Sequence, residues 1–191
     1  MTLIINNSRI STKNTPYIIA ELSANHNGSL ERALKSIKGA KEAGANAVKI
    51  QTYTPDTMTI DSDKKDFLIK GGIWDGLNLY KLYEEAHTPY EWHKDLFAYA
   101  KEIGITIFST PFDKTAVELL GSLETPAYKI ASFELTDIPL IKLVSQTRKP
   151  LLMSTGMANE IEIEEAVVTA RDNGCKSLLL FHCISSYPAT T

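Results

Sequence analysis

Short apolar runs rich in β-branched residues recur along the chain, and between them apolar residues repeat at helical spacing. Such runs are typical of strands that a parallel sheet buries on both faces, and the intervening pattern is that of amphipathic helices. The predicted strands are residues 17–20, 47–50, 105–108, 128–130, 151–153 and 178–181. The predicted helices are residues 30–43, 92–102, 114–120, 139–145 and 160–173. Strand and helix alternate, which predicts an α/β fold.

Glycines mark the expected helix ends. Gly44, Gly104 and Gly174 each follow a helical segment and precede a predicted strand. This is the position where a residue with left-handed backbone geometry closes a helix, and glycine adopts that geometry at little cost. The positions of these glycines therefore support a series of βα units.

Polar residues gather directly after the apolar runs, and ligands bind at the carboxyl ends of strands in parallel α/β folds. These residues are Glu21, Gln51, Ser109, Thr110, Ser132, Glu134, Ser154, Thr155, His182 and Ser185. The turn after the first strand, residues 21–28, lacks the GxGxxG pattern of an open nucleotide-binding sheet. We therefore expect a (β/α)8 TIM barrel. Because a complete barrel needs roughly 250 residues, we expect this one to be truncated after about six strands.

Two segments do not fit the repeat. Residues 3–12 read as a β-hairpin that turns at Asn6 and Asn7, and we expect residues 1–14 to cap the amino end of the barrel. The connection 52–89 is much longer than a usual βα loop, and long ordered loops are often functional. We expect it to face the substrate and to contain a short helix at 77–86.

Composition and charge narrow the class of protein. The chain has 20 Lys and Arg against 23 Asp and Glu, a net charge of -3, with no basic block. This argues against nucleic-acid and membrane partners, and no apolar run is long enough to cross a bilayer. We expect a cytoplasmic protein with a small-molecule partner. Cys175 and Cys183 lack metal-ligand spacing, and we expect them to be reduced, packed thiols.

Six motifs lie at the ends of the predicted strands in chain order, at residues 19–28, 48–52, 108–112, 127–132, 154–157 and 182–183. Together they resemble the sialic acid synthase family. Members of this family are transferases that condense phosphoenolpyruvate with an N-acetylated sugar aldehyde, giving a nonulosonic acid and phosphate. The resemblance covers nearly all of the chain and implies the same barrel and reaction.

Further segments resemble the pseudaminic acid synthase branch of that family, namely residues 53–59, 71–76, 83–86 and 131–134. This branch implies a 2,4-diacetamido-2,4,6-trideoxy hexose as the acceptor and pseudaminic acid as the product. His182 departs from the pattern, because many members of the branch have lysine there and histidine is closer to the N-acetylneuraminate and legionaminate synthases. Those two activities are the alternatives within the family.

The resemblance implies a phosphoenolpyruvate site made of Lys49, Thr110, Lys129, Ser132 and Ser154. Fixed cations and hydroxyl donors suit a ligand with a phosphate and a carboxylate. Both lysines lie in apolar strands, where an unpaired ammonium is costly, so buried salt bridges are the alternative. For each hydroxyl, the alternative is a turn or a helix cap.

The resemblance also assigns the remaining roles. Glu134 is expected to act as general base or to position water, and Glu21 to hold a sugar hydroxyl near the reacting carbon, with a salt bridge to Lys49 as its alternative. A buried Glu134 would have a raised pKa, whereas a nearby lysine would lower it. Further sugar contacts are expected from Gln51, Trp74, Ser185 and Tyr187, and His182 is a possible pocket residue.

The remaining expectations concern the metal, three histidines, and parts of the protein outside this sequence. The family uses a divalent metal, Mn2+ or Mg2+, as a Lewis acid, and we expect its ligands beyond residue 191. His26 is expected to order its loop, and His87 and His93 to be surface or capping residues. The resemblance also implies a C-terminal antifreeze-like domain, absent from residues 1–191, and a homodimer at full length.

Two rival classes of function remain open. One is an aldolase on the same fold that forms a Schiff base through Lys129 or Lys49. The other is a non-catalytic, truncated barrel. The sequence ends at residues 187–191, soon after the last predicted strand. A barrel opened there would expose an unpaired strand edge, which favours association.

Overall fold

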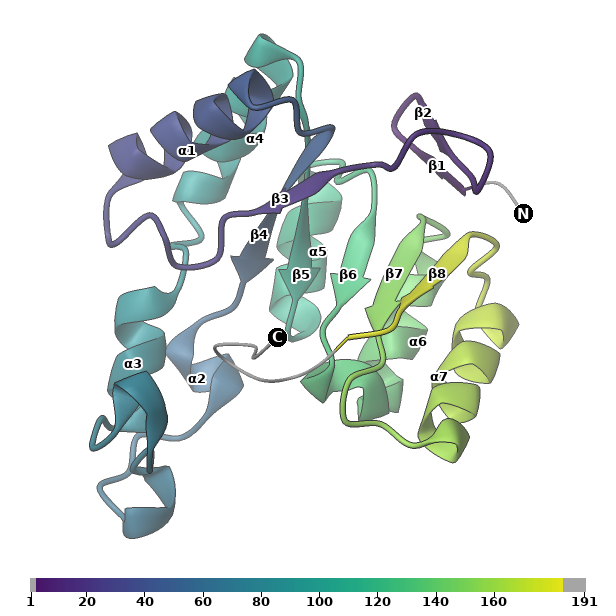
Figure 1. Cartoon of the computed structure of the whole chain (residues 1–191). Helices are drawn as coiled ribbons and strands as arrows, with labels where there is room; N and C mark the ends of the chain where they lie inside the picture. Colours follow the sequence, from purple (N-terminus) through teal and green to yellow (C-terminus); the bar gives the residue numbers. More distant parts are fainter. Residues whose placement is uncertain (1–2, 184–191) are drawn as a thin grey trace.

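Six parallel strands form one curled sheet in the computed structural model, which describes residues 3–183 (Figure 1). Neighbours in the sheet follow chain order, as in a barrel. The strands are β3 (Ile19–Glu21), β4 (Ala47–Thr52), β5 (Thr106–Pro111), β6 (Tyr128–Ile130), β7 (Leu151–Ser154) and β8 (Leu178–Phe181). The α/β prediction and all six predicted strands are confirmed.

Helices cover the outer side of the curl (Figure 1). They are α1 (Leu30–Glu42), α4 (Trp92–Ile103), α5 (Lys114–Ser122), α6 (Ile138–Gln146) and α7 (Glu160–Asp172). Each predicted helix is present, with bounds that differ by a residue or two. Gly44, Gly104 and Gly174 have φ values of 90°, 72° and 105°, so the left-handed positions expected after helices are confirmed. No helix in residues 3–183 is long and apolar enough to cross a membrane.

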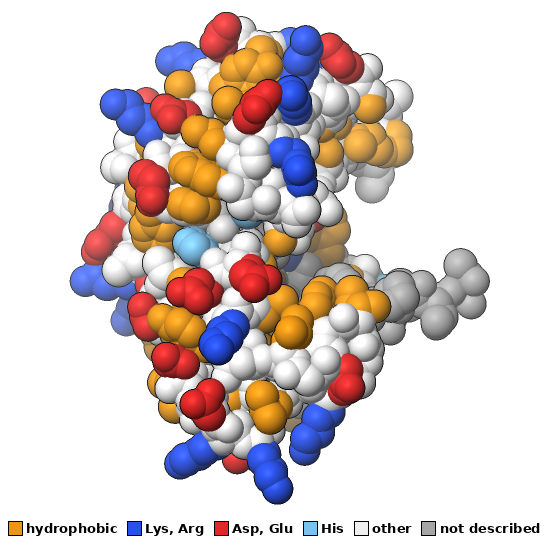
Figure 2. Space-filling model, turned by 90° about the vertical axis from the view of Figure 1, so that its left-hand side faces the viewer, with side chains coloured by type: hydrophobic (Ala, Val, Ile, Leu, Met, Phe, Trp, Pro, Cys, Tyr) orange, Lys and Arg blue, Asp and Glu red, His pale blue; other side chains and the backbone are white. Residues whose placement is uncertain are grey.

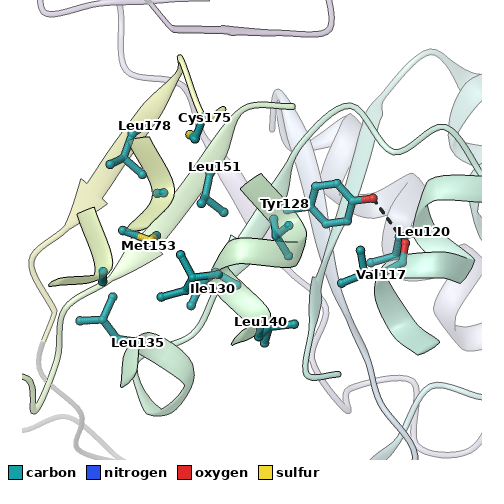
Figure 3. Close-up of a cluster of buried hydrophobic side chains, with 14 residues drawn as sticks. Val117, Leu120, Tyr128, Ile130, Leu135, Leu140, Leu151, Met153, Cys175 and Leu178 are labelled. Atoms are coloured by element: carbon teal, nitrogen blue, oxygen red, sulfur yellow. Dashed lines mark hydrogen bonds between the residues drawn. The ribbon is translucent and has the colours of Figure 1, made fainter. Parts of the chain in front are cut away.

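Alternation along the strands divides their side chains between two faces, because successive residues of a strand point to opposite sides. On the outer side, Tyr128, Ile130, Leu151 and Met153 pack with residues of α5, α6 and α7 (Figure 3). The hydroxyl of Tyr128 donates to the carbonyl of Val117 at 3.4 Å. Another outer cluster joins Val48, Ile50 and Ile107 to residues of α1 and α4. The main cores therefore lie between sheet and helices.

The inner face of the curl is apolar at the amino ends of the strands. Here β1 (Leu3–Ile5) and β2 (Ser8–Ile10) form the antiparallel hairpin that the sequence predicts. Leu3 and Ile5 share a buried cluster with Ala47, Phe108, Ala127 and Leu152. Further along the same face come Lys49, Thr110, Lys129 and Ser154, by the alternation of each strand. An apolar floor thus lies beneath a polar layer.

Strands β4 and β5 extend further than predicted at their carboxyl ends. We expected Gln51 and Thr110 just after their strands, but β4 continues to Thr52 and β5 to Pro111, so both residues lie within the sheet, paired in register. The polar residues that point outward here are Thr52 and Ser109, which hydrogen bond to each other at 2.6 Å. Because their polar atoms are paired, these residues can stay in a buried strand.

The long connection after β4 lies beyond the carboxyl ends of the strands (Figure 1). It contains α2 (Pro55–Met58), two short 3-10 turns at Lys65–Phe67 and Gly72–Trp74, and α3 (Leu79–Ala86). Only α3 was predicted, at 77–86. In the view of Figure 2, hydrophobic side chains alternate with charged ones over this lower part of the molecule. A further 3-10 turn, Phe133–Thr136, follows β6.

Candidate active site

Glu21, Lys49 and Thr110 come together on the inner face at the carboxyl ends of three adjacent strands. Glu21 and Lys49 are register partners on β3 and β4, and their carboxylate and ammonium groups form an ion pair at 2.5 Å. The same ammonium donates to the hydroxyl of Thr110 on β5 at 3.1 Å. The salt bridge that the sequence offered as the alternative role of Glu21 is therefore present. In this ion pair the side chain of Lys49 is 15% exposed and that of Glu21 is 41% exposed.

Lys129 stands on the inner face of β6 and is 8% exposed. Its ammonium donates to the hydroxyl of Ser154 on β7 at 2.5 Å and to the carbonyl of Ile130 at 2.6 Å. It also lies 5.7 Å from the centre of the Phe181 ring. Among the described residues, no carboxylate forms an ion pair with Lys129. The buried salt bridge considered for this lysine is therefore not found in residues 3–183.

The two lysines are close enough to repel each other. Burial, and after it the charge of Lys49, lower the pKa of Lys129 to about 8 against the opposing effect of nearby acidic groups. Among the described residues, the one carboxylate that forms an ion pair with either ammonium group is Glu21, on the strand next to Lys49 and away from Lys129. This arrangement attracts anions, and the low exposure of Lys129 strengthens the attraction because water screens it less.

The hydroxyls of Thr110 and Ser154 are not helix caps. The side chain that caps α5 is Asp113, and the one that caps α7 is Asn159. Thr110 and Ser154 instead accept hydrogen bonds from the two lysines. Ser132 is at the N-cap position of a 3-10 turn, but its side chain makes no capping bond. The capping alternative is therefore wrong for all three.

Glu134 projects from the 3-10 turn after β6 into a buried position. Its Oε2 atom is buried and has no hydrogen-bond partner among the described residues. Burial raises the pKa of Glu134, and the opposing effect of Lys129 is smaller. The sequence could not decide between these two influences, and the structure shows that desolvation is the larger.

Tyr83 of α3 lies close enough to Glu134 for that carboxylate to raise its pKa, although burial is the larger cause. Its ring packs edge-on against Tyr53, with centroids 5.7 Å apart, and Tyr53 packs likewise against Phe112. The long connection therefore brings α3 back towards the end of β6. Our sequence analysis did not single out Tyr83 as a site residue, because no local pattern links α3 to Glu134.

Cys183 differs from the packed thiol that we expected. It is half-buried, and its sulfur lies 3.6 Å from the hydroxyl of Ser132. Burial raises its pKa, but hydrogen bonds from Ser154, Ser132 and the backbone of residues 155–156 outweigh burial and lower the pKa to about 7. Cys175 is buried in the outer core, as expected. The prediction that Cys183 is a packed thiol is therefore wrong, because this residue follows β8 directly and lies at the polar rim.

The histidines divide between buried and accessible positions. His26 is fully buried, accepts from the backbone of Gly28 at 3.2 Å and lies 3.4 Å from the hydroxyl of Thr88. His87 caps the end of α3. His93 is fully buried, so its assignment as a surface or capping residue is wrong. It shares the inward face of α4 with Leu96 and Ala100, three and seven residues on, and this spacing was visible in the sequence.

The remaining predicted residues are spread more widely. Gln51 is half-buried on the inner face of β4, two residues after Lys49. Trp74 lies 40% exposed in the long connection, and His182 is exposed after β8. Ser185 and Tyr187 lie outside the described residues. Within residues 3–183, no three His, Cys, Asp or Glu side chains gather in a group that could hold a metal ion.

Comparison with known proteins identifies the family of the chain. The model of the NeuB family matches residues 36–191. The chain is 52% identical over 178 residues to the pseudaminic acid synthase of Campylobacter jejuni, covering 93% of this chain and 52% of that protein. It is 47% identical over 174 residues to the pseudaminic acid synthase of Helicobacter pylori, covering 91% and 51%. The chain thus spans about half the length of these relatives.

A solved structure gives the same result for the fold. The N-acetylneuraminic acid synthetase of Leptospira borgpetersenii, in complex with citrate, matches with a TM-score of 0.85 and 29% identity. The match covers 100% of this chain and 61% of that one. The curled sheet with its hairpin therefore corresponds to part of a sialic acid synthase TIM barrel, as the sequence predicts. The chain belongs to the NeuB family of sialic acid synthases, and within that family it is most similar to pseudaminic acid synthases.

Proposed function

We propose that the protein is a pseudaminic acid synthase. It condenses phosphoenolpyruvate with a 2,4-diacetamido-2,4,6-trideoxy hexose, and the products are pseudaminic acid and phosphate. The observation that carries this proposal is the pair of lysines, Lys49 and Lys129, on the inner rim of a NeuB-family barrel. A ligand with a phosphate and a carboxylate supplies the negative charge that this rim lacks.

The rim provides phosphoenolpyruvate with two cations and several hydroxyl donors. In our proposal Lys49 and Lys129 bind its anionic groups, and Thr110, Ser154 and Ser132 add hydrogen bonds. The hydroxyls of Thr110 and Ser154 already contact the lysines, at 3.1 Å and 2.5 Å, so little rearrangement is needed for them to reach the same ligand. The apolar floor behind them, with Phe108 and Leu152, limits access of water from the amino end.

Glu134 is our candidate for the proton-transfer step. When C3 of phosphoenolpyruvate forms the new carbon–carbon bond, water must add at C2 and lose a proton before phosphate leaves. A buried carboxylate with a raised pKa and a free Oε2 is suited to accept that proton. Tyr83 is near enough to help hold the water or the carboxylate in place.

Glu21, Gln51 and Trp74 are proposed to contact the acceptor sugar, together with Ser185, Tyr187 and His182. Glu21 is the accessible member of its ion pair with Lys49, so it can turn to a sugar hydroxyl when the anionic ligand takes over the lysine. The pseudaminate acceptor is favoured over the other two because the relatives at 52% and 47% identity described above are named pseudaminic acid synthases. We further propose that the whole protein is a homodimer, as the family resemblance implies.

A divalent metal, Mn2+ or Mg2+, is implied by the family, where it would polarise the aldehyde oxygen of the acceptor. The described residues do not supply its site, since no suitable group of three ligands is present in residues 3–183. We propose that the metal ligands lie outside the described part of the chain.

The test is a product assay with three acceptors. The protein is incubated with phosphoenolpyruvate, Mn2+ and either the 2,4-diacetamido-2,4,6-trideoxy hexose, its legionaminate counterpart or N-acetylmannosamine. We expect phosphate release and a nonulosonic acid, detected by mass spectrometry, with the first sugar. Equal or faster reaction with another sugar would overturn the acceptor assignment, and no phosphate release from an intact, folded full-length protein would overturn the function.

An aldolase that uses Lys129 is the second candidate, because a pKa of about 8 leaves part of that amine neutral and nucleophilic near neutral pH. Borohydride reduction in the presence of pyruvate would trap an imine on this lysine as a mass increase of the peptide. We expect no adduct, and a stoichiometric one would favour the aldolase.

A further inference from the structure

A buried hydrogen-bonded network lies behind the polar rim, between the sheet and α4. The Nε2 atom of His93 is 2.8 Å from the hydroxyl of Thr52, which is 2.6 Å from the hydroxyl of Ser109. The hydroxyl oxygen of Ser109 also lies 3.0 Å from the carbonyl oxygen of Ile50. On its other side, the Nδ1 atom of His93 lies 3.0 Å from the carbonyl of Pro89. The network thus joins β4, β5, α4 and the end of the long connection.

The partners of His93 determine its tautomer. A carbonyl oxygen can only accept, so Nδ1 carries the proton and donates to Pro89, and Nε2 is left as the acceptor for the hydroxyl of Thr52. Burial lowers the pKa of His93, which keeps the imidazole neutral and available as an acceptor. The hydroxyl of Thr52 can then accept from Ser109. Since a hydroxyl has one proton, Ser109 then donates to Thr52 at 2.6 Å rather than to the carbonyl of Ile50 at 3.0 Å.

The network is adjacent in sequence to the proposed phosphoenolpyruvate site. Thr52 follows Gln51 on β4, and Ser109 precedes Thr110 on β5. Because side chains alternate, the network points outward where Gln51 and Thr110 point inward. The hydrogen bond between Lys49 and Thr110 crosses the same two strands at 3.1 Å. Any shift of these strand ends changes that distance directly.

We propose that His93 is a positioning residue for the phosphoenolpyruvate site. By accepting from Thr52 and donating to Pro89, it holds the carboxyl ends of β4 and β5 at the spacing that lets Lys49 and Thr110 bind one anion. This inference rests on the proposed function and deepens it. His93 touches no substrate, and it acts only through Thr52 and Ser109.

Two substitutions separate the two hydrogen bonds of the ring. His93→Asn places an amide near Nδ1, so it keeps the bond to Pro89 and loses the acceptor for Thr52. His93→Gln places an amide near Nε2, so it keeps the acceptor for Thr52 and loses the bond to Pro89. His87→Asn and His87→Gln are the matched controls, because within residues 3–183 the His87 ring hydrogen bonds only to the local carbonyl of Glu84.

We expect His93→Asn to raise the Kd for phosphoenolpyruvate about fivefold to tenfold, the effect of one lost buried hydrogen bond. His93→Gln should stay within twofold of the wild type, as should both His87 variants. Thr52→Val should reproduce the effect of His93→Asn, and the double variant should add nothing further. A merely structural role predicts that the His93 variants lose thermal stability and have equal affinities, and that result would overturn the proposal.

Crystal structures of the two His93 variants decide the inference separately from the function. We expect the Lys49–Thr110 distance to stay near 3.1 Å in His93→Gln and to lengthen in His93→Asn. If the wild type binds no phosphoenolpyruvate but these distances change as expected, the proposed function fails and the positioning of the strand ends stands. If the wild type binds it and the distances are unchanged in both variants, the positioning role fails alone.

Discussion

Lys49 and Lys129 occupy equivalent places on neighbouring parts of the barrel but have different surroundings. Lys49 is paired with Glu21 at 2.5 Å. Lys129 is more deeply buried, and its hydrogen-bond partners among the described residues are a hydroxyl and a carbonyl, both neutral. Its pKa falls to about 8, with burial as the main cause. Within the described residues, Lys49 therefore has a carboxylate partner and Lys129 has none.

This difference suggests that Lys129 lowers the stability of the folded chain and in return strengthens anion binding. A buried ammonium without a carboxylate destabilises the folded chain, and such a cost is retained where it serves function. In the proposed site, a bound anion would recover the cost at Lys129, so binding energy would be concentrated there. At Lys49 the anion would compete with Glu21, and the released carboxylate would be available to the sugar of our proposal.

The largest effect is expected at Glu134, which lies near Lys129. Glu134→Gln should lower the turnover rate by about 10²–10⁴-fold, because an amide cannot accept the proton of the attacking water. The affinity for phosphoenolpyruvate should change by less than about twofold. Phosphate release and calorimetric titration measure the two quantities. An equal loss of both would place Glu134 in anion binding.

Removing the unpaired lysine should weaken binding next most strongly. Lys129→Met should raise the Kd for phosphoenolpyruvate about 10–100-fold, since charge-assisted hydrogen bonds to a desolvated ammonium are lost. Lys142→Met on α6 is a control remote from the inner face. Calorimetric titration provides the measurement, and unaltered affinity in Lys129→Met would exclude this residue from the site.

The pH dependence of binding should also distinguish Lys129. Its lowered pKa of about 8 means that the ammonium is mostly charged at pH 7 and loses its charge as the pH rises. The Kd should therefore increase up to about tenfold per unit above pH 8, and Lys129→Met should lack this slope. A Cys183→Ala background removes the thiol that titrates at about 7. An identical slope in both proteins would contradict the assignment.

The stability of the unliganded protein should increase as the pH rises, whereas the affinity for phosphoenolpyruvate should decrease. Because the folded pKa of Lys129 lies below its unfolded value, the charged form costs stability at pH values below about 8, and this cost fades as the pH approaches 10. Lys129→Met should therefore raise the free energy of unfolding by roughly 1–3 kcal/mol at pH 7, and by less at pH 9.5. Urea titrations at both pH values measure this. A destabilised variant at pH 7 would show that Lys129 is already satisfied in the empty site.

The smallest effect concerns the thiols. Cys183 lies beside Ser132 and should react with iodoacetamide at pH 7 faster than the buried Cys175. Phosphoenolpyruvate should slow the alkylation of Cys183 several-fold, because the ligand occupies the neighbouring donors. Peptide mass spectrometry gives both rates. Protection of neither thiol at saturating ligand would separate Cys183 from the site.

Much of the fold follows from the sequence, because each element is encoded locally. The apolar run at residues 128–130 is a strand with those bounds, and the segment beginning at Glu160 is a helix. The inner placement of Lys49 and Lys129 also follows from alternation, once the flanking residues are assigned to the outer core. Parallel strands then bring the two lysines to one rim.

What the sequence did not reveal depends on contacts between distant segments. The exposure of Cys183 depends on where β8 ends relative to Ser132, some fifty residues earlier. The approach of Tyr83 to Glu134 depends on the path of the long connection before and after α3, and no local pattern predicts that path. His93 is different, since its spacing with Leu96 and Ala100 indicated burial and the polar side chain obscured that signal.

The most direct test of this account is a crystal structure of the protein with phosphoenolpyruvate. We expect oxygens of one bound molecule within about 3 Å of both the Lys49 and the Lys129 ammonium groups. We also expect the Glu21 carboxylate to have moved from its 2.5 Å contact with Lys49. A ligand bound elsewhere, with the Glu21–Lys49 pair intact and Lys129 contacting only Ser154 and Ile130, would contradict the account.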